Sequence, residues 1–131
     1  MDMRTQGTAM KTILIVEDDT AIGEVLIQVL SQETPHQSVL VPNGFQALDI
    51  VRKLIPDLLL LDYRLPGMNG LELYDRLHAT KGPEHIPTIM LSAYLPQREI
   101  KQRKIVGMHK PFELDILLDK IEELLSATMK R

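Results

Sequence analysis

The 131-residue sequence contains no cysteine, no long hydrophobic run and no excess of basic residues. Without cysteine there are no disulfides, thiolate metal sites or cysteine nucleophiles, and a cytoplasmic location is expected. No apolar stretch approaches the roughly 20 residues of a membrane-spanning helix, and the polar residues 1–10 do not resemble a signal peptide. The formal net charge of −3 argues against direct binding to nucleic acid or to an anionic membrane.

The composition that is present, 44% hydrophobic and 25% charged residues, is typical of one soluble globular domain. A chain of this length can bury a sizeable core. We expect residues 11–128 to form the domain, residues 1–10 to be a flexible extension and residues 129–131 to be a tail.

Short apolar runs alternate five times with segments of helical periodicity. Strands are expected at 11–16, 37–41, 57–61, 86–91 and 105–108. Helices are expected at 20–30, 45–54, 70–79, 96–104 and 113–125. Buried strands that alternate with amphipathic helices predict an α/β fold, a parallel sheet covered on both faces. The order of the strands cannot be read from this pattern.

Polar residues follow several of the expected strands. Four leucines, typical of a strand buried on both faces, lead directly into Asp62. Glu17 and Asp18 follow the first strand, Ser92 the fourth and Lys110 the fifth. The carboxyl ends of parallel strands lie along one edge of a sheet, so these side chains converge if their strands are neighbours.

Such a group of side chains predicts a site for a cation and an oxyanion. Carboxylates a few ångströms apart repel each other and require a cation or a raised pKa. Oxygen ligands suit Mg²⁺, with Mn²⁺ as an alternative. The hydroxyl and the ammonium group could hold a doubly charged phosphoryl group, and a carboxylate such as Asp62 can carry one covalently.

The motifs Glu17-Asp18, Leu61-Asp62, Ser92-Ala93 and Lys110-Pro111-Phe112 together resemble the receiver domains of two-component response regulators. The resemblance extends over residues 11–127. It implies a flavodoxin-like (βα)5 doubly wound sheet of order 2-1-3-4-5. It also implies a signalling protein that is not an enzyme, although it assists its own phosphorylation and dephosphorylation.

The resemblance implies a role for each matching residue of the acidic cluster. Asp62 would accept a phosphoryl group from a sensor histidine kinase or a histidine phosphotransfer protein. Asp18 and Asp62 would bind Mg²⁺ directly. Glu17 would act through water, and the backbone carbonyl of Arg64 would complete the protein ligands.

The resemblance also implies contacts to the bound phosphoryl group. Ser92, the backbone N–H of Ala93 and Lys110 would contact its oxygens. The Lys110–Pro111 peptide bond is expected to be cis. The side chains of Arg64 and Tyr94, at the rim, would influence how long the phosphoryl group persists.

Two features depart from the family pattern. Gly107 stands where most receivers have a Tyr or Phe whose ring swings inward on activation. The segment from Ser92 to Lys110 is a few residues short, which predicts a shortened fourth helix region. The phosphorylation site therefore matches the family, whereas the usual signalling face is expected to be altered.

Other functions stay open at this stage. We expect a monomer or weak dimer that signals through a downstream protein target. The main alternative is a pseudo-receiver or phosphate sink with atypical output. A flavodoxin-like FMN protein is less favoured because this sequence has no phosphate-binding loop after the first strand. An aspartate-nucleophile phosphatase is less favoured because its nucleophile would follow the first strand, whereas Asp62 follows the third. A basic run on the helix expected at 96–104 is typical of a solvated face or, less often, of a surface for an acidic partner. The histidines His36, His78 and His85 show no metal-ligand spacing and are expected at the surface.

Overall fold

The computed structural model of the chain describes residues 10–80 and 85–129, without the side chains of residues 127–129. The expected N-terminal extension, apart from Met10, and residues 130–131 of the expected tail lie outside the described residues. No helix in the described part is long and apolar enough to cross a membrane.

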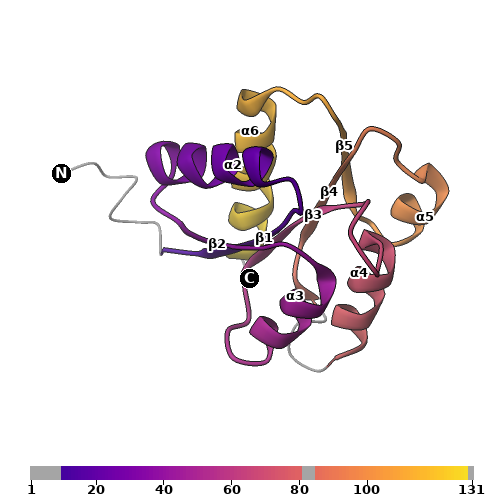
Figure 1. Cartoon of the computed structure of the whole chain (residues 1–131). Coiled ribbons are helices and arrows are strands. Elements are labelled where there is room, and N and C mark those ends of the chain that lie inside the picture. The colour runs from indigo at the N-terminus through magenta and orange to yellow at the C-terminus, as the bar shows by residue number, and fades with distance from the viewer. Residues whose placement is uncertain (1–9, 81–84, 130–131) are drawn as a thin grey trace.

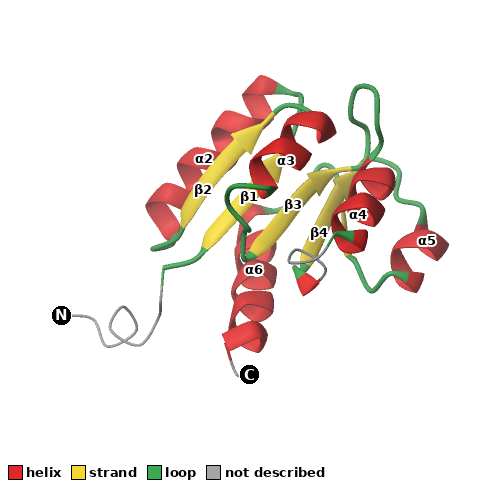
Figure 2. Cartoon of the chain, turned by 90° about the horizontal axis from the view of Figure 1, so that it is seen from below, coloured by secondary structure: helices red, strands yellow, loops and turns green. Residues whose placement is uncertain are grey.

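Five parallel strands form one sheet of order β2-β1-β3-β4-β5 (Figures 1 and 2). They are β1 (Thr12–Val16), β2 (Gln37–Val41), β3 (Leu58–Asp62), β4 (Thr88–Ser92) and β5 (Val106–His109). This topology is the flavodoxin-like order that the motifs implied, so the predicted fold is confirmed. All five residues of β3 are buried, because β3 lies between β1 and β4 and is covered on both faces.

Five helices complete the alternation. They are α2 (Thr20–Glu33), α3 (Gly44–Val51), α4 (Gly70–Ala79), α5 (Gln97–Gln102) and α6 (Leu114–Met129). The predicted bounds are wrong by a few residues at several ends. The helix predicted at 45–54 ends at Val51, and Leu54 is 38% exposed. The helix predicted at 96–104 is shorter still, with only six residues.

The helices cover the two faces of the sheet unequally. Helices α2 and α6 pack on one face through Leu26, Leu30, Leu117, Ile121 and Leu125, and α3 and α4 cover the other (Figure 1). Helix α5 packs at the β4–β5 side, where it covers Met90 of β4. The sheet edge beside β5 is therefore the most thinly covered part of the core.

The surface position predicted for His36 is wrong. This residue is buried, with 6% exposure. Its Nδ1 accepts a hydrogen bond from the Lys11 backbone N–H at 3.1 Å, and its Nε2 lies 3.4 Å from Oε1 of Glu122 on α6. The ring thus connects the start of β1 to α6, a structural role.

Candidate functional site

The polar residues at the carboxyl ends of β1, β3 and β5 meet at one edge of the sheet. Glu17, Asp18 and Asp62 can each place one carboxylate oxygen within 4.8 Å of the other two. Among the described residues this is the only such group of three or more potential metal ligands. The convergence follows from the strand order, which places β1, β3 and β4 side by side.

Asp62 is held at the end of the buried strand β3 and is 7% exposed. Its Oδ1 accepts a hydrogen bond from the Arg64 backbone N–H at 3.1 Å, and its Oδ2 accepts one from Lys110 Nζ at 3.1 Å. The loop behind it folds back closely: the Gly70 N–H donates to the Tyr63 carbonyl at 2.7 Å. A Cβ at Gly70 would lie 2.7 Å from the Asp62 carbonyl oxygen, so only glycine lets α4 begin this close to β3.

Lys110 is the cation that offsets the charge of this cluster. Its ammonium group donates to Oε1 of Glu17 at 2.9 Å as well as to Asp62. Burial of Lys110 acts to lower its pKa, but the hydrogen bonds to Glu17 and Asp62 outweigh burial and raise this pKa above its ordinary value. Lys110 is therefore charged at neutral pH.

Glu17 is the most deeply buried of the three carboxylates, with 4% exposure. Its Oε2 accepts a hydrogen bond from the Asp19 backbone N–H at 3.2 Å. Burial, together with the nearby Asp62, raises the pKa of Glu17, although the Lys110 ammonium opposes the shift. A bound cation would relieve the same repulsion.

Ser92 is the last residue of β4 and is 2% exposed. Its Oγ accepts a hydrogen bond from the Tyr94 backbone N–H at 3.1 Å. Because a hydroxyl also has a hydrogen to donate, Ser92 can serve an oxyanion beside it. The Lys110 backbone N–H donates to the Ser92 carbonyl at 2.9 Å, which joins the two loops, and the Lys110–Pro111 peptide bond is cis.

The donor set fits Mg²⁺. Glu17, Asp18 and Asp62 offer hard carboxylate oxygens, which Mg²⁺ prefers to nitrogen or sulfur ligands. Asp18 is exposed, so one side of the cluster stays open to water. The Arg64 backbone N–H donates a hydrogen bond to Asp62. That the Arg64 carbonyl is a metal ligand stays a prediction.

The side chains of the rim residues are exposed to solvent, and Gly107 lies on β5 against α5. Ala93 and the Arg64 side chain are exposed, and the Tyr94 side chain is 67% exposed. Gly107 lies in the edge strand β5 and faces α5. The structure thus brings together Glu17, Asp18, Asp62 and Lys110, but it separates Gly107 from them.

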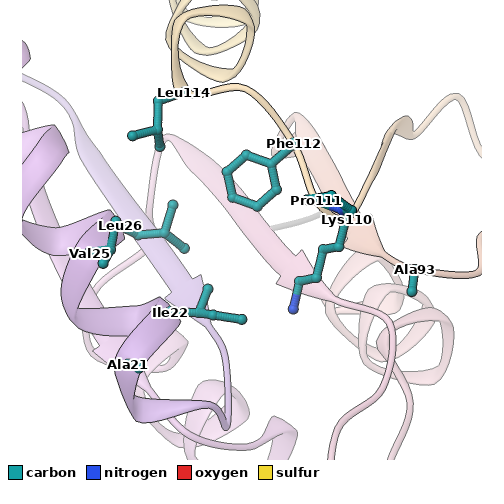
Figure 3. Close-up of a pocket in the computed structure, with 9 residues that line it drawn as sticks. All are labelled: Ala21, Ile22, Val25, Leu26, Ala93, Lys110, Pro111, Phe112 and Leu114. Atoms are coloured by element: carbon teal, nitrogen blue, oxygen red, sulfur yellow. The ribbon is translucent and has the colours of Figure 1, made fainter.

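An apolar hollow of about 670 Å³ lies beside the charged cluster (Figure 3). It separates the first turns of α2 from the loop between β5 and α6. Its lining residues are Ala21, Ile22, Val25, Leu26, Ala93, Lys110, Pro111, Phe112 and Leu114. This hollow was not predicted from the sequence, because the helical spacing of apolar residues does not show that Val25 is left 49% exposed. Together with the other apolar lining residues, Val25 forms an open apolar surface beside the charged cluster.

Comparisons with known proteins agree with the geometry. Residues 13–122 match the family model described as "Response regulator receiver domain". The sporulation initiation phosphotransferase F of Bacillus subtilis is 38% identical over 117 residues, which cover 86% of this chain and 92% of that protein. The DNA-binding response regulator MtrA of Mycobacterium tuberculosis is 43% identical over 86 residues, but the match covers 66% of this chain and only 36% of that protein.

Several solved structures are similar to this chain in both sequence and fold, among them one from a sensor histidine kinase. It is the receiver domain of a sensor histidine kinase from Pseudomonas aeruginosa, described with a magnesium ion coordinated in its active site cleft. It has 25% identity and a TM-score of 0.76, and the match covers 90% of this chain and 99% of that chain.

Proposed function

The chain belongs to the family of response regulator receiver domains of two-component systems, and we propose that it accepts a phosphoryl group on Asp62 in a Mg²⁺-dependent reaction. The observation that carries this proposal is the position of Asp62. Its carboxylate ends a buried strand, contacts the Lys110 ammonium at 3.1 Å and lies next to two further carboxylates. The phosphorylated domain would then signal through contacts with a downstream protein.

The chemistry is a transfer between a phosphohistidine and a carboxylate. An oxygen of Asp62 attacks the phosphorus atom, the new O–P bond forms, and the P–N bond to the donor histidine breaks. The leaving imidazole takes up a proton and returns to its ordinary state on the donor. No side chain of this chain has to give up a proton, so positioning and charge compensation are what the site contributes.

Each neighbouring residue has a part in this compensation. Lys110 already donates to Asp62 and so lies beside the incoming phosphoryl oxygens. The Ser92 hydroxyl accepts a hydrogen bond from the Tyr94 N–H, and its hydrogen is left to donate to one of them. Asp18, Asp62 and the Arg64 carbonyl would hold Mg²⁺ directly and Glu17 through water, and the bound ion would supply positive charge to offset that of the phosphoryl oxygens.

Phosphorylation by a small donor tests the assignment of Asp62. Wild-type protein incubated with acetyl phosphate and Mg²⁺ should gain one phosphoryl group by intact-mass measurement. Asp62→Asn should gain none while keeping the wild-type circular dichroism spectrum. Asp49→Asn, the same change at an exposed carboxylate of α3, should behave as wild type. A phosphoryl gain in Asp62→Asn, or a wild-type gain in the presence of EDTA, would contradict the proposal.

The apolar hollow beside Lys110 supports a protein donor that docks there. A phosphohistidine must reach Asp62 from outside, and the hollow of Figure 3 lies on that approach with Lys110 in its lining. Val25→Asp should slow transfer from a phosphorylated histidine phosphotransfer protein about tenfold, because a charge would be buried against an apolar partner. The rate with acetyl phosphate should not change, since a small donor needs no docking. Equal slowing of both rates would count against this docking face.

A phosphate sink with atypical output is the second candidate, favoured by Gly107. The β5 position facing α5 has no ring that could report the state of Asp62. Beryllium fluoride with Mg²⁺ separates the two functions by NMR. A switch predicts shifts at Asp62, Ser92 and also Ile100 of α5. A sink predicts shifts at Asp62 and Ser92 alone.

A further inference from the structure

The loop between β3 and α4 is fixed by hydrogen bonds at its two ends. At its start, the Arg64 backbone N–H donates to Oδ1 of Asp62 at 3.1 Å. At its end, Asn69 caps α4 by accepting a hydrogen bond from the Glu72 backbone N–H at 2.9 Å. Residues 65–68 form no hydrogen bond with any other described residue. The middle of the loop is therefore held by packing.

The beginning of α3 supplies this packing, and α3 lies beside α4 on the same face of the sheet (Figures 1 and 2). Gly44 and Phe45, the first residues of α3, face the consecutive loop residues Met68 and Gly67. A Cβ at Gly44 would lie 2.9 Å from Sδ of Met68. A Cβ at Gly67 would lie 2.9 Å from Cε2 of Phe45, and its three nearest atoms all belong to that ring. The contact is reciprocal, because each glycine makes room for a side chain of the other segment.

Gly67 is the loop residue that most needs an external restraint. Its φ of 78° lies in the left-handed region, which glycine adopts without steric cost. Glycine has access to more backbone conformations than any other residue, so its own chemistry does not select this one. The Phe45 ring lies directly against Gly67, and the neighbouring Met68 is buried at 3% exposure. These two side chains restrict the loop where its backbone is most free.

The position of Phe45 on α3 fits this role better than a role in the core. Ala47 and Val51 are the side chains through which α3 is buried, whereas Phe45 is 53% exposed. The helix that carries the ring is itself fixed at this end. Asn43 caps it by accepting a hydrogen bond from the Gln46 backbone N–H at 2.8 Å. The ring therefore stands on a rigid support, as a residue that positions a loop requires.

We propose that Phe45 is a positioning residue for the metal site, because its ring holds the β3–α4 loop in the conformation that keeps the Arg64 backbone beside Asp62. Phe45 acts only through the loop. Movement at Gly67 would shift the Arg64 carbonyl together with the N–H that bonds Asp62. The inference rests on the proposed function, since that function assigns the Arg64 carbonyl to Mg²⁺.

Mg²⁺ titration of the full chain by NMR, starting from metal-free protein, is the test. Phe45→Ala should raise the Kd for Mg²⁺ about tenfold, the lower end of the loss expected when a residue that orients a ligand is removed. In the metal-free protein, the order parameters of the Gly67 and Met68 amides should fall, because the loop is less restricted. The rate of phosphorylation by acetyl phosphate should fall at low Mg²⁺ and recover at saturating Mg²⁺.

Matched variants separate positioning from a general loss of stability. Phe45→Tyr keeps the ring and should keep the wild-type Kd within about twofold, a shift well below the tenfold expected for the alanine variant. Ile55→Ala, at an apolar residue after α3 that is 50% exposed, should leave the Kd unchanged. Gly67→Ala should weaken Mg²⁺ binding, because its Cβ meets the Phe45 ring. In the Phe45→Ala background the same change should weaken it less, since the ring is gone.

Two outcomes would overturn this inference alone. One is a wild-type Kd and wild-type order parameters in folded Phe45→Ala. The other is an equal rise of the Kd in Phe45→Ala and Ile55→Ala. If Phe45→Ala does not fold, Phe45→Leu takes its place, with a smaller rise of the Kd expected and an unchanged Kd as the contrary result. Absence of Mg²⁺ binding by the wild type would instead overturn the proposed function together with this inference.

Discussion

The carboxyl edge of the sheet and the α5–β5 corner are built in opposite ways. At the edge, Glu17 and Asp62 are almost fully buried and share one ammonium group at 2.9 and 3.1 Å. At the corner, a six-residue helix covers an edge strand and leaves a hollow at Gly107. The first region has strong, specific interactions and little room for change. The α5–β5 corner has fewer such interactions, so its surface can vary without altering the chemistry at Asp62.

The largest effect on stability is expected at the charged edge. Lys110→Met leaves the buried Glu17 without its cation and should lower the free energy of unfolding by roughly 3 kcal/mol at pH 7 without Mg²⁺. Urea denaturation measures this value. Lys120→Met removes a surface pair with Glu123, 3.4 Å apart and largely exposed, and should cost less than about 0.5 kcal/mol.

The same variant gives a second measurement. Mg²⁺ should restore part of the stability of Lys110→Met, because a cation bound by the carboxylates replaces the lost positive charge. If Lys110→Met and Lys120→Met have equal stability, the ammonium does not carry the electrostatic balance of the site. The charged edge would then not be more strongly stabilised by electrostatic interactions than an exposed surface pair.

The charged edge could be predicted from sequence because each of its residues adjoins a strand. The run Leu58 to Leu61 indicates a buried strand, and the position of Asp62 directly after it is sufficient to place its carboxylate. The strand order came from the family resemblance rather than from periodicity. Without that order, the meeting of Glu17 with Lys110, 93 positions apart in sequence, could not have been inferred.

The next largest effect is expected at Gly107. Gly107→Phe should lower the free energy of unfolding by about 1–3 kcal/mol, because the new side chain must displace Ile100 and with it the cover of Met90. Gly107→Ala should cost less, since only the flexible end of Ile100 has to move. Urea denaturation gives the two values, and methyl NMR of Ile100 reports its displacement. A fully stable Gly107→Phe with an unmoved Ile100 would show that α5 is not packed against this position.

The corner could be predicted only in part. Comparison with the family pattern shows that Gly107 replaces the usual aromatic residue and that the segment from Ser92 to Lys110 is short. It does not indicate that Ile100 lies over this position, since that depends on where a six-residue helix packs and ends. Arg103 was placed with a solvated basic run, yet it pairs with Asp75 on α4. Contacts between helices far apart in sequence leave no local pattern.

The smallest effect is expected for the ion pair that holds α5 to α4. The Arg103 guanidinium donates to both carboxylate oxygens of Asp75, at 2.7 and 2.9 Å, and the Tyr74 hydroxyl donates to the Arg103 carbonyl at 2.9 Å. The hydrogen bond from Arg103 lowers the pKa of Asp75. Asp75→Asn should therefore lower the free energy of unfolding at pH 7, by less than about 1 kcal/mol because the Asp75 side chain is 53% exposed.

The pH dependence of this difference has a definite sign. A carboxyl group whose pKa is lower in the folded state stabilises the fold above its unfolded pKa, near 3.8, and this contribution disappears as the pH falls through the folded value. Wild type and Asp75→Asn should thus differ at pH 7 and converge below pH 3.8. The coulombic effect of His78 on Asp75 acts in the same direction as that of Arg103 and is also lost in Asp75→Asn, so it forms part of the measured difference. Asp49→Asn, at an exposed carboxylate of α3, should show no difference at either pH. If Asp75→Asn also shows none, the ion pair does not stabilise the corner, and α5 is held by the packing of Ile100 and by the hydrogen bond from Tyr74 to the Arg103 carbonyl.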